Sequence, residues 1–358
     1  MNCNSNSAPP NPPAPPPCQG PNCTSGSSAS AGSFDPNDKL APSGYGEAGF
    51  IQFGDTLAYE VRFENKSDAT APARLITVTD TLDPNLDLSA FELFQISFAN
   101  QTLSIPTGLD RYEDLIPLTF TNPLTGVRCD ACVWLEVQAA LDFETRTLTL
   151  TLSVLDPLTG WYPDDPLLGL LYPENGTGRG QGSISYLVSP NANATSGTII
   201  TNRARIVFDY NDPIDTPLVS NAIDSAAPSS HVSSLAPNNS PSFLVQWSGS
   251  DSGGGGIANY DVYYSADGTN YIRWLDHTTT TSTIFSGAAG FTYRFYSVAR
   301  DNVGYEELPP LMPDAQTTTS GNTPPILNTL AARVGFVGRT LFVTNSAFDL
   351  DLPAQRLT

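Results

Sequence analysis

Short stretches in which apolar and polar residues alternate recur along the chain. In residues 57–64 the apolar side chains of Leu57, Tyr59, Val61 and Phe63 fall at every second position. This period places them on one face of a β-strand, with the polar residues on the other. The same pattern predicts further strands at residues 74–80, 133–137, 146–154, 182–188, 203–208, 243–247, 260–264, 280–285 and 293–300.

Turn signals separate these stretches, and helical periodicity is missing. Asp-Pro-Asn at residues 83–85, Asp-Pro-Leu-Thr-Gly at 156–160 and Glu-Asn-Gly at 174–176 are typical turn sequences. No window keeps an apolar period of about 3.6 residues, which an amphipathic helix would need. Many short strands between such turns predict an all-β fold of tandem β-sandwiches.

Composition divides the chain into four regions. Residues 1–33 are rich in Pro, Ser and Gly, which predicts a disordered linker. Residues 34–225 and 226–319 are each long enough for a sandwich of their own. Residues 320–358 open a third unit and stop within it. Both ends read as cut, so we expect an internal segment of a larger protein, and missing export signals carry no weight.

The charge balance argues against two classes of partner. The chain has 16 Lys and Arg against 36 Asp and Glu, a net charge of −20. That negative field repels phosphate backbones and anionic lipid. No apolar run reaches the roughly 20 residues that cross a bilayer. We therefore expect neither nucleic-acid binding nor membrane insertion of this segment.

The first region resembles a family of uncharacterised domains in large secreted bacterial proteins. The resemblance is carried by seven ordered motifs: Ser-Phe-Asp-Pro-Asn-Asp-Lys at 33–39, Phe-Glu-Asn at 63–65, Thr-Asp-Thr-Leu-Asp at 79–83, Asn-Leu-Asp at 85–87, Asp-Pro-Leu-Thr-Gly at 156–160, Glu-Asn-Gly-Thr-Gly-Arg-Gly at 174–180 and Phe-Asp-Tyr-Asn-Asp-Pro-Ile at 208–214. The family has no assigned activity, so the resemblance implies an extracellular setting and leaves the role open.

The second and third regions resemble better-known modules. Trp247, the Tyr-x-Val-x-Tyr stretch at 260–264 and Tyr293 stand where a fibronectin type III module keeps its core tryptophan, a long strand and its corner tyrosine. The Gly run at 253–256 departs from that pattern and reads as a flexible loop. Asn-Thr-Pro-Pro at 322–325 and the stretch at 347–354 resemble the opening of a cadherin- or immunoglobulin-like repeat.

Candidate catalytic groups are scarce. The two histidines, His231 and His277, fall in a linker-like stretch and a Thr-rich turn, and no Gly-x-Ser-x-Gly elbow is present. The five cysteines are compatible with a local disulfide or with reduced thiols, and less so with a zinc site. Exposed aromatics at Trp161 and Trp274 are candidates for sugar stacking, with packed loop anchors as the favoured alternative. We expect no enzyme activity.

Three oxygen-rich turns are candidate calcium sites. They contain Asp35, Asn37 and Asp38, then Asp209, Asn211 and Asp212, and finally Asp349 and Asp351. Calcium takes six to eight oxygen ligands, which closely spaced Asp and Asn can supply. The same residues also form turns without any ion, by accepting hydrogen bonds from backbone amides. Ca²⁺ is the one cofactor that the sequence suggests.

The interpretation is a non-catalytic structural, adhesive or spacer segment of a secreted or cell-surface bacterial protein. Its partner would be a protein or carbohydrate at the cell surface. The alternative is an accessory region of an extracellular hydrolase whose catalytic domain lies outside this segment. A third hypothesis, that residues 34–225 are themselves an enzyme, rests on the lack of any known role for the resembling family.

Overall fold

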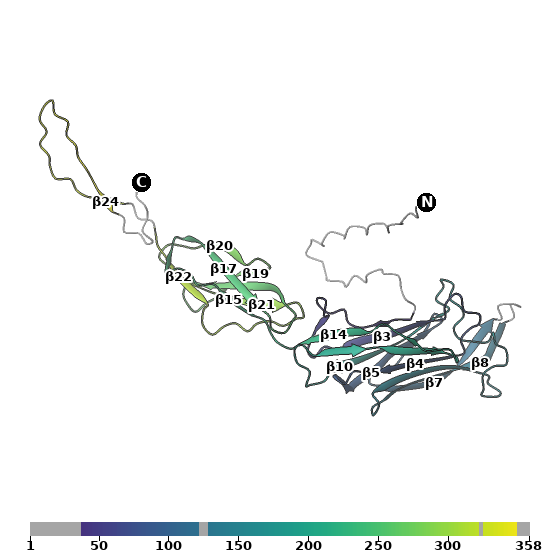
Figure 1. Cartoon of the computed structure of the whole chain (residues 1–358). Coiled ribbons are helices and arrows are strands. Elements are labelled where there is room, and N and C mark those ends of the chain that lie inside the picture. Colours follow the sequence, from purple (N-terminus) through teal and green to yellow (C-terminus); the bar gives the residue numbers. More distant parts are fainter. Residues whose placement is uncertain (1–36, 122–127, 322–324, 349–358) are drawn as a thin grey trace, which may run out of the picture. The chain divides into compact units, whose positions relative to one another are not determined.

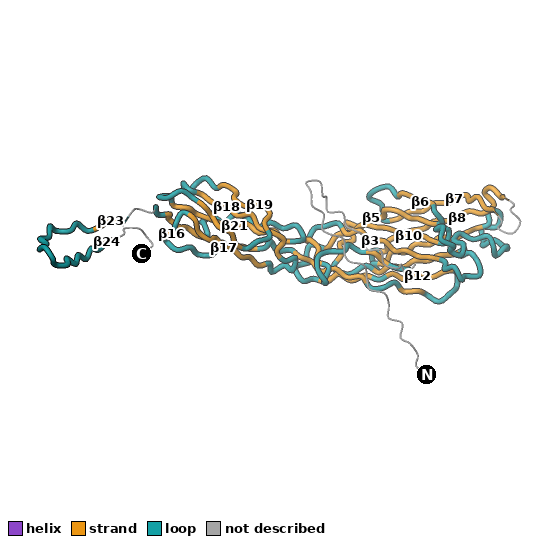
Figure 2. The backbone as a smooth tube through the Cα atoms, turned by 90° about the horizontal axis from the view of Figure 1, so that it is seen from above, coloured by secondary structure: helices purple, strands orange, loops and turns teal. Residues whose placement is uncertain are grey.

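The computed structural model describes residues 37–121, 128–321 and 325–348. Every regular element in these residues is a β-strand, which confirms the predicted all-β class (Figures 1 and 2). Two hydrophobic cores form, one from residues between Ile51 and Ile223 and one from residues between Val232 and Ala315. They belong to two successive β-sandwiches, and the described residues all fall within one compact unit, residues 36–358.

Two large sheets enclose the first core. One sheet has five strands in the order β1 (Lys39–Leu40), β3 (Leu57–Glu64), β10 (Gln181–Pro190), β5 (Leu86–Phe98) and β6 (Gln101–Ser104). The other has six in the order β13 (Ile214–Asp215), β12 (Ala204–Phe208), β4 (Leu75–Thr81), β9 (Thr147–Leu155), β8 (Arg128–Asp142) and β7 (Arg111–Thr121). All neighbouring strands in both sheets are antiparallel.

The alternating pattern explains which side chains reach this core. Strand β3 matches the predicted stretch residue for residue, and its four apolar side chains are buried while their neighbours are half-buried or exposed. Strand β4 continues the pattern with Ile76 and Val78 buried. Each inward row therefore removes a continuous apolar stripe from water, which is the main stabilising contribution to a sandwich.

A smaller sheet pairs strands from the beginning and from the end of the chain segment that forms the first sandwich. Its order is β11 (Ile199–Asn202), β14 (Val219–Asp224) and β2 (Phe50–Gln52). The β14–β2 pair is parallel, with Ala222 opposite Phe50 and Asp224 opposite Gln52. A strand near the start of the sandwich thus lies beside its last strand, and both run in the same direction.

The second sandwich repeats this arrangement with fewer strands. Its sheets have the orders β15 (Ser229–Val232), β17 (Ser242–Ser250), β20 (Ser282–Ser286) and β16 (Asn238–Asn239), β22 (Ala315–Thr319), β21 (Thr292–Asp301), β18 (Ile257–Ser265), β19 (Ile272–Thr278). The early strand β16 pairs in parallel with the last strand β22, with Asn238 opposite Thr318.

Aromatic side chains fill the second core, as the fibronectin type III resemblance implies. Trp247 is 2% exposed and meets Trp274 edge to face, with ring centroids 6.4 Å apart. Tyr293 is also buried and packs against Phe285 at 4.9 Å. The predicted core tryptophan and corner tyrosine therefore both lie inside the sandwich.

Beyond residue 321 the described chain contains one short antiparallel pair, β23 (Ile326–Leu327) with β24 (Ala347–Phe348). The cadherin- or immunoglobulin-like character of this region stays a prediction, as do the domain boundaries at residues 33, 225 and 319. The described residues include no helix long and apolar enough to cross a membrane.

Candidate functional site

The most unusual group in the first sandwich is a buried polar cluster of Lys39, Asp80, Tyr186 and Asn202. Lys39 Nζ contacts Asp80 Oδ2, and both side chains have no exposed surface. Tyr186 Oη accepts a hydrogen bond from Lys39 Nζ at 2.8 Å and donates one to Asp80 Oδ2 at 2.7 Å. It also accepts one from Asn202 Nδ2 at 2.9 Å. A single hydroxyl oxygen therefore touches an amine, a carboxylate and a carboxamide.

These four side chains come from different strands of the sandwich. Lys39 lies on β1 and Tyr186 on β10, both in the five-stranded sheet, whereas Asp80 lies on β4 of the six-stranded sheet. Asn202 ends β11, two residues before Ala204, which is paired with Asp80. The contact between Lys39 and Asp80 thus connects the two principal layers through the core.

Burial controls the protonation of this cluster. Loss of hydration lowers the pKa of Lys39 to about 8, although the adjacent Asp80 charge opposes the shift. Burial, with the negative charge of Asp80 in support, raises the pKa of Tyr186 well above its usual range. The lysine is therefore much easier to deprotonate than one in water, and Tyr186 remains a neutral hydroxyl.

Two oxygens of the cluster remain without hydrogen-bond partners in the described structure. They are Asp80 Oδ1 and Asn202 Oδ1, and both are buried. A buried acceptor without a donor costs about 1–3 kcal/mol, so such atoms are uncommon in native cores. An ordinary buried ion pair would not combine two unpaired acceptors with an amine whose pKa is lowered, so this cluster is chemically distinct.

The alternating strand pattern contains a signal for this cluster that the turn motifs do not. Asp80 continues the inward row of Ile76 and Val78, where the period predicts an apolar residue. Asn202 likewise falls in phase with Ile200 and Ala204, which are both buried. A polar residue at an inward position of a strand is therefore the feature that would have located these two groups.

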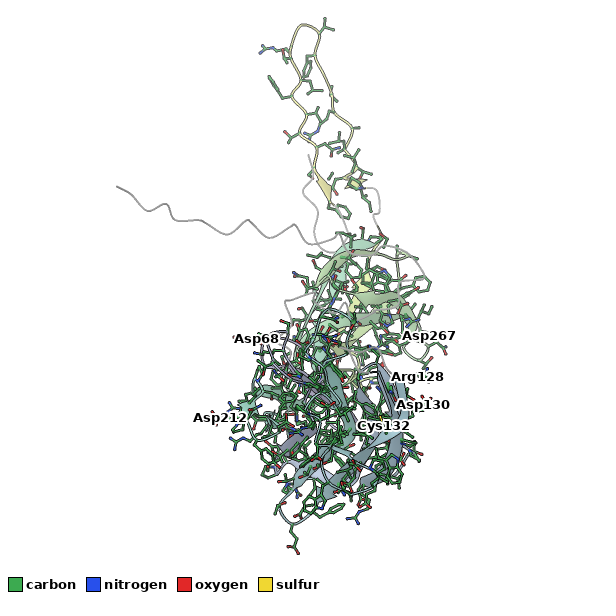
Figure 3. The ribbon with its side chains drawn as sticks, turned by 90° about the vertical axis from the view of Figure 1, so that its right-hand side faces the viewer. Asp68, Arg128, Asp130, Cys132, Asp212 and Asp267 are labelled. Carbon is green, nitrogen blue, oxygen red and sulfur yellow. The ribbon has the colours of Figure 1, made fainter. Side chains whose placement is uncertain are left out.

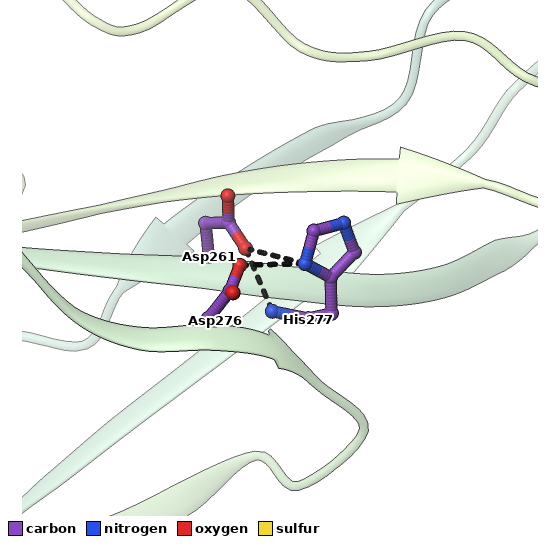
Figure 4. Close-up of side chains that lie close together, drawn as sticks. All are labelled: Asp261, Asp276 and His277. Carbon is purple, nitrogen blue, oxygen red and sulfur yellow. Dashed lines mark hydrogen bonds and ion pairs between the residues drawn. The ribbon is translucent and has the colours of Figure 1, made fainter. Parts of the chain in front are cut away.

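A second cluster, formed by Asp261, Asp276 and His277, lies on the second sandwich (Figure 4). His277 Nδ1 is 2.6 Å from Asp276 Oδ1, and the backbone amide of His277 donates to Asp261 Oδ1 at 2.8 Å. Arg300 Nη1 lies 2.5 Å from His277 Nε2. A guanidinium can only donate, so a hydrogen bond between these two atoms runs from Arg300 to His277.

This second cluster is already neutralised by protein cations. Arg273 Nη1 contacts Asp261 Oδ2 at 3.3 Å and Asp276 Oδ1 at 2.9 Å, and Arg300 adds a contact to Asp261 at 3.5 Å. Burial alone would raise the pKa of Asp261, but the amide of His277 and the two arginines lower it. We interpret the group as an ion-pair network, because the arginines occupy the positions that a metal cation would take.

A third cluster contains Asp224, Asp251 and Asp301, whose carboxylate oxygens lie within 4.8 Å of one another. Asp224 and Asp301 are buried, and Asp251 is half-buried. None of the three forms an ion pair with Lys, Arg or His in the described part of the chain. Three negative groups therefore face one another with no protein cation between them.

The Gly run at 253–256 wraps this third cluster, so its interpretation as a plain flexible loop was wrong. Gly255 N donates to Asp224 Oδ2 at 2.7 Å, while Gly254 N and Gly256 N donate to Asp251 Oδ2 at 3.0 and 2.7 Å. A Cβ on Gly253 would lie 1.7 Å from Asp224 Oδ1. Glycine is required because the backbone approaches the carboxylate more closely than any side chain allows.

The calcium ligands predicted from sequence are only partly described. Asp35, Asp349 and Asp351 lie outside the described residues. Asn37 is buried, and its Oδ1 accepts a hydrogen bond from Glu64 N at 3.2 Å, while Asp38 is half-buried. Calcium binding at these positions stays a prediction.

In the second predicted calcium turn, around Asp209, backbone amides donate to the carboxylate, as they do in turns that need no ion. Asp209 Oδ1 accepts hydrogen bonds from the amides of Arg74 and Leu75, both at 3.0 Å. Asn211 and Asp212 are exposed, and Figure 3 places Asp212 at the surface. The Asp209 carboxylate therefore serves to hold the start of β4. Calcium binding at this turn stays a prediction.

The candidate aromatic residues differ in exposure. Trp161 is 75% exposed, so its interpretation as a packed loop anchor was wrong. Trp274 packs against Phe285 and Phe295, at 5.2 and 6.1 Å between ring centroids, and belongs to the second core. Of the two, only Trp161 presents a ring face to a ligand.

A family model described as a domain of unknown function, DUF7619, matches residues 35–115 and 170–222. No curated protein matches the chain.

Solved structures resemble the chain distantly. The fibronectin(III)-like modules of Clostridium thermocellum CbhA have a TM-score of 0.27 at 9% identity, over 79% of this chain and 94% of theirs. The C-terminal fragment of the major pilin GBS80 of Streptococcus agalactiae has a TM-score of 0.30 at 10% identity, over 87% and 90%. The collagen-binding domain of a Staphylococcus aureus adhesin has a TM-score of 0.26 at 12% identity, over 54% and 99%.

Proposed function

We propose that this chain is a non-catalytic, load-bearing spacer of a secreted or surface-exposed bacterial protein, which holds a binding partner away from the cell. The single observation that carries this proposal is the parallel pairing at the ends of both sandwiches. In the first, β2 lies parallel to the last strand β14, and in the second β16 lies parallel to β22.

Parallel pairing of the end strands determines how tension acts on each sandwich. A pull between the two chain ends draws the two paired strands in opposite directions along their own length. Their hydrogen bonds are then loaded together in shear, whereas an antiparallel hairpin pulled at its open end would break one bond at a time. A protein that links two bodies under tension benefits from this arrangement, and an enzyme has no need of it.

Hydrogen bonds at the first of these pairs define where the load falls. Phe53 N donates to Asp224 O at 2.7 Å, and Ala222 N donates to Gly49 O at 3.3 Å. Both contacts join the early segment around β2 to the last strand of the sandwich. They are therefore among the bonds that must break before β14 can be pulled away.

Single-molecule stretching of the chain between its ends tests the proposal. We expect two mechanical unfolding events, one for each sandwich, and a lower force for the first sandwich in Phe53→Pro, which lacks the amide donor to Asp224. Thr102→Pro on the edge strand β6 is the control, because that strand is outside the loaded pair. Equal forces for the wild type and Phe53→Pro would contradict a load-bearing role for this pair.

A further inference from the structure

We propose that Lys39 and Asn202 become joined by an intramolecular isopeptide bond between Lys39 Nζ and Asn202 Cγ, with Asp80 transferring the protons. The proposal goes beyond the spacer function and rests on the geometry of the buried cluster. An amine, an amide and a carboxylate meet around Tyr186 Oη, at 2.8, 2.9 and 2.7 Å respectively.

The nucleophile in this step is the neutral amine of Lys39. Its complete burial disfavours the charged form, and this effect outweighs the attraction of the Tyr59 and Tyr186 rings, whose centroids lie 5.0 and 5.2 Å from Nζ. The lowered pKa, about 8, agrees with this environment. In direct contact with Nζ, Asp80 is placed to accept the proton that the attacking amine loses.

The atoms of the step balance without a cofactor or an oxidant. Lys39 Nζ attacks Asn202 Cγ, and the C–N bond to Nδ2 breaks as the new C–N bond forms. Asp80 receives a proton from Nζ and returns one to Nδ2, which leaves as ammonia. The side chains of Lys39 and Asp80 have no exposed surface, so bulk water cannot compete as the nucleophile.

The two unpaired oxygens fit the same step. Asn202 Oδ1 is the carbonyl oxygen that gains negative charge during the attack, and in the described structure it has no donor. Asp80 Oδ1 is likewise unpaired.

Such a bond would change how the first sandwich responds to tension. Lys39 lies near the start of the described chain and Asn202 near the end of the sandwich, so the bond would enclose residues 39–202 in a covalent loop. Force entering before Lys39 would pass directly to Asn202. Only the segment after Asn202, including β12 and β14, could then be drawn out.

Intact-mass spectrometry of the full chain tests this bond. We expect the wild type to be lighter than the sequence predicts by one ammonia, and tryptic digestion to give a branched peptide joining residues 1–62 to residues 180–203. A succinimide at an asparagine also loses one ammonia, so the branched peptide decides between them. An unchanged mass, or loss of one water through a Lys39–Asp80 bond, would overturn the proposal.

Variants provide the matched controls. Lys39→Met removes the nucleophile and Asp80→Asn removes the proton carrier, so both should keep the full mass and give no branched peptide. Lys66→Met changes an exposed lysine and should still lose one ammonia. The wild-type measurement needs no variant, so poor folding of Lys39→Met would not remove the test. A branched peptide in Asp80→Asn at the wild-type yield would refute the role of Asp80.

A separate observation supports a second inference, that Asp224, Asp251 and Asp301 bind a calcium ion. We infer this site from the unpaired Asp301 Oδ2, an oxygen of a side chain only 5% exposed. Its other oxygen, Oδ1, accepts the amides of Val303, Gly304 and Tyr305, which holds the carboxylate in place. One carboxylate oxygen from each of the three residues lies within 4.8 Å of the other two.

Electrostatics in this third cluster favours a hard cation. No Lys, Arg or His pairs with the three carboxylates in the described chain, in contrast to the arginine-paired Asp261 cluster. A divalent ion with oxygen ligands would offset the repulsion among them.

Titration of the full chain with CaCl2, followed by thermal melts in CaCl2 and in a chelator, tests the site. We expect binding heat and a higher melting temperature with calcium, both lost in Asp301→Asn, whose side-chain oxygen still accepts the three amides. Asp276→Asn in the arginine-paired cluster is the control and should respond as the wild type does. No heat and equal melting temperatures in the wild type would overturn the site, as would loss of binding only in Asp276→Asn.

Discussion

Tyr293 Oη accepts a hydrogen bond from the backbone amide of Ala288 at 2.8 Å, and this contact fixes the corner before strand β21. Tyr293 is 6% exposed, whereas Ala288 is an exposed loop residue, so the bond is part-buried. Its phenol ring also lies against Phe285 and Tyr264. One residue thus closes the loop and contributes to the second core.

Tyr293→Phe isolates the hydrogen bond, because the ring is kept. We expect the free energy of unfolding of the second sandwich to fall by about 1–2 kcal/mol, since a part-buried amide loses its partner. Urea denaturation followed by tryptophan fluorescence measures this change. The control is Tyr271→Phe, because the Tyr271 hydroxyl bonds no loop amide in the described part of the chain. A loss of equal size there would contradict the argument.

Glu174 organises the glycine-rich turn that precedes strand β10. Its carboxylate accepts the amides of Gly176, Gly178 and Gly180 at 2.6, 2.9 and 2.7 Å. Burial alone would raise the pKa of Glu174, but these amides outweigh it and the pKa is lowered. A depressed carboxyl pKa stabilises the fold above the pKa of the unfolded chain, and the effect disappears as the pH falls through the folded value.

Glu174→Gln therefore should lower stability near neutral pH by about 2 kcal/mol, because an amide replaces a charged acceptor. The difference from the wild type should shrink in acid, where the wild-type carboxyl also becomes neutral. Denaturant titrations at neutral and acid pH measure both effects. Glu113→Gln, at an exposed position on β7, is the control. A difference that stays constant with pH would contradict the role of the charge.

The strands were the easiest part of this fold to predict. Residues 57–64 form β3 without a shift, because each inward residue is apolar and the outward ones, apart from Ala58, are charged. The thirteen-residue β5 was missed, since its buried row changes phase between Leu93 and Ile96, where the pairing with β10 is irregular. Local patterning reveals a strand only when one face is uniformly apolar, and the pairing of distant strands has no local signature at all.

The candidate sites were harder to predict for the same reason. Closely spaced acids in turns, such as Asp209 and Asp212, suggest a calcium site from sequence. In the structure Asp209 accepts hydrogen bonds from backbone amides. The groups that meet in the structure, Lys39, Asp80 and Asn202, are up to 163 positions apart in the sequence. Only the tertiary fold brings such residues together. A polar residue at an inward position of its strand was the one local signal.

The contribution of Trp247 to the stability of the second core can be compared with that of an exposed residue on the same strand. Trp247→Ala should cost about 3–5 kcal/mol, because a 2%-exposed ring is lost and the space it leaves cannot be refilled. Leu244 is 48% exposed on β17, so Leu244→Ala is the matched control and should cost well under 1 kcal/mol. Calorimetry of the full chain should show the effect of Trp247→Ala in the transition of the second sandwich. Equal costs for the two variants would contradict the core assignment.

Gly253 tests whether the backbone around Asp224 must approach as closely as described. An added Cβ would lie 1.7 Å from Asp224 Oδ1, which already accepts the amide of Ala226 at 3.0 Å. The carboxylate cannot move aside without losing that bond and the one from Gly255, so Gly253→Ala should lower the free energy of unfolding by about 1–3 kcal/mol. Gly335→Ala, where an added Cβ meets nothing within 4 Å, is the control and should have little effect. Thermal melts of both variants measure the difference, and an unchanged midpoint for Gly253→Ala would show that Asp224 does not lie against this glycine.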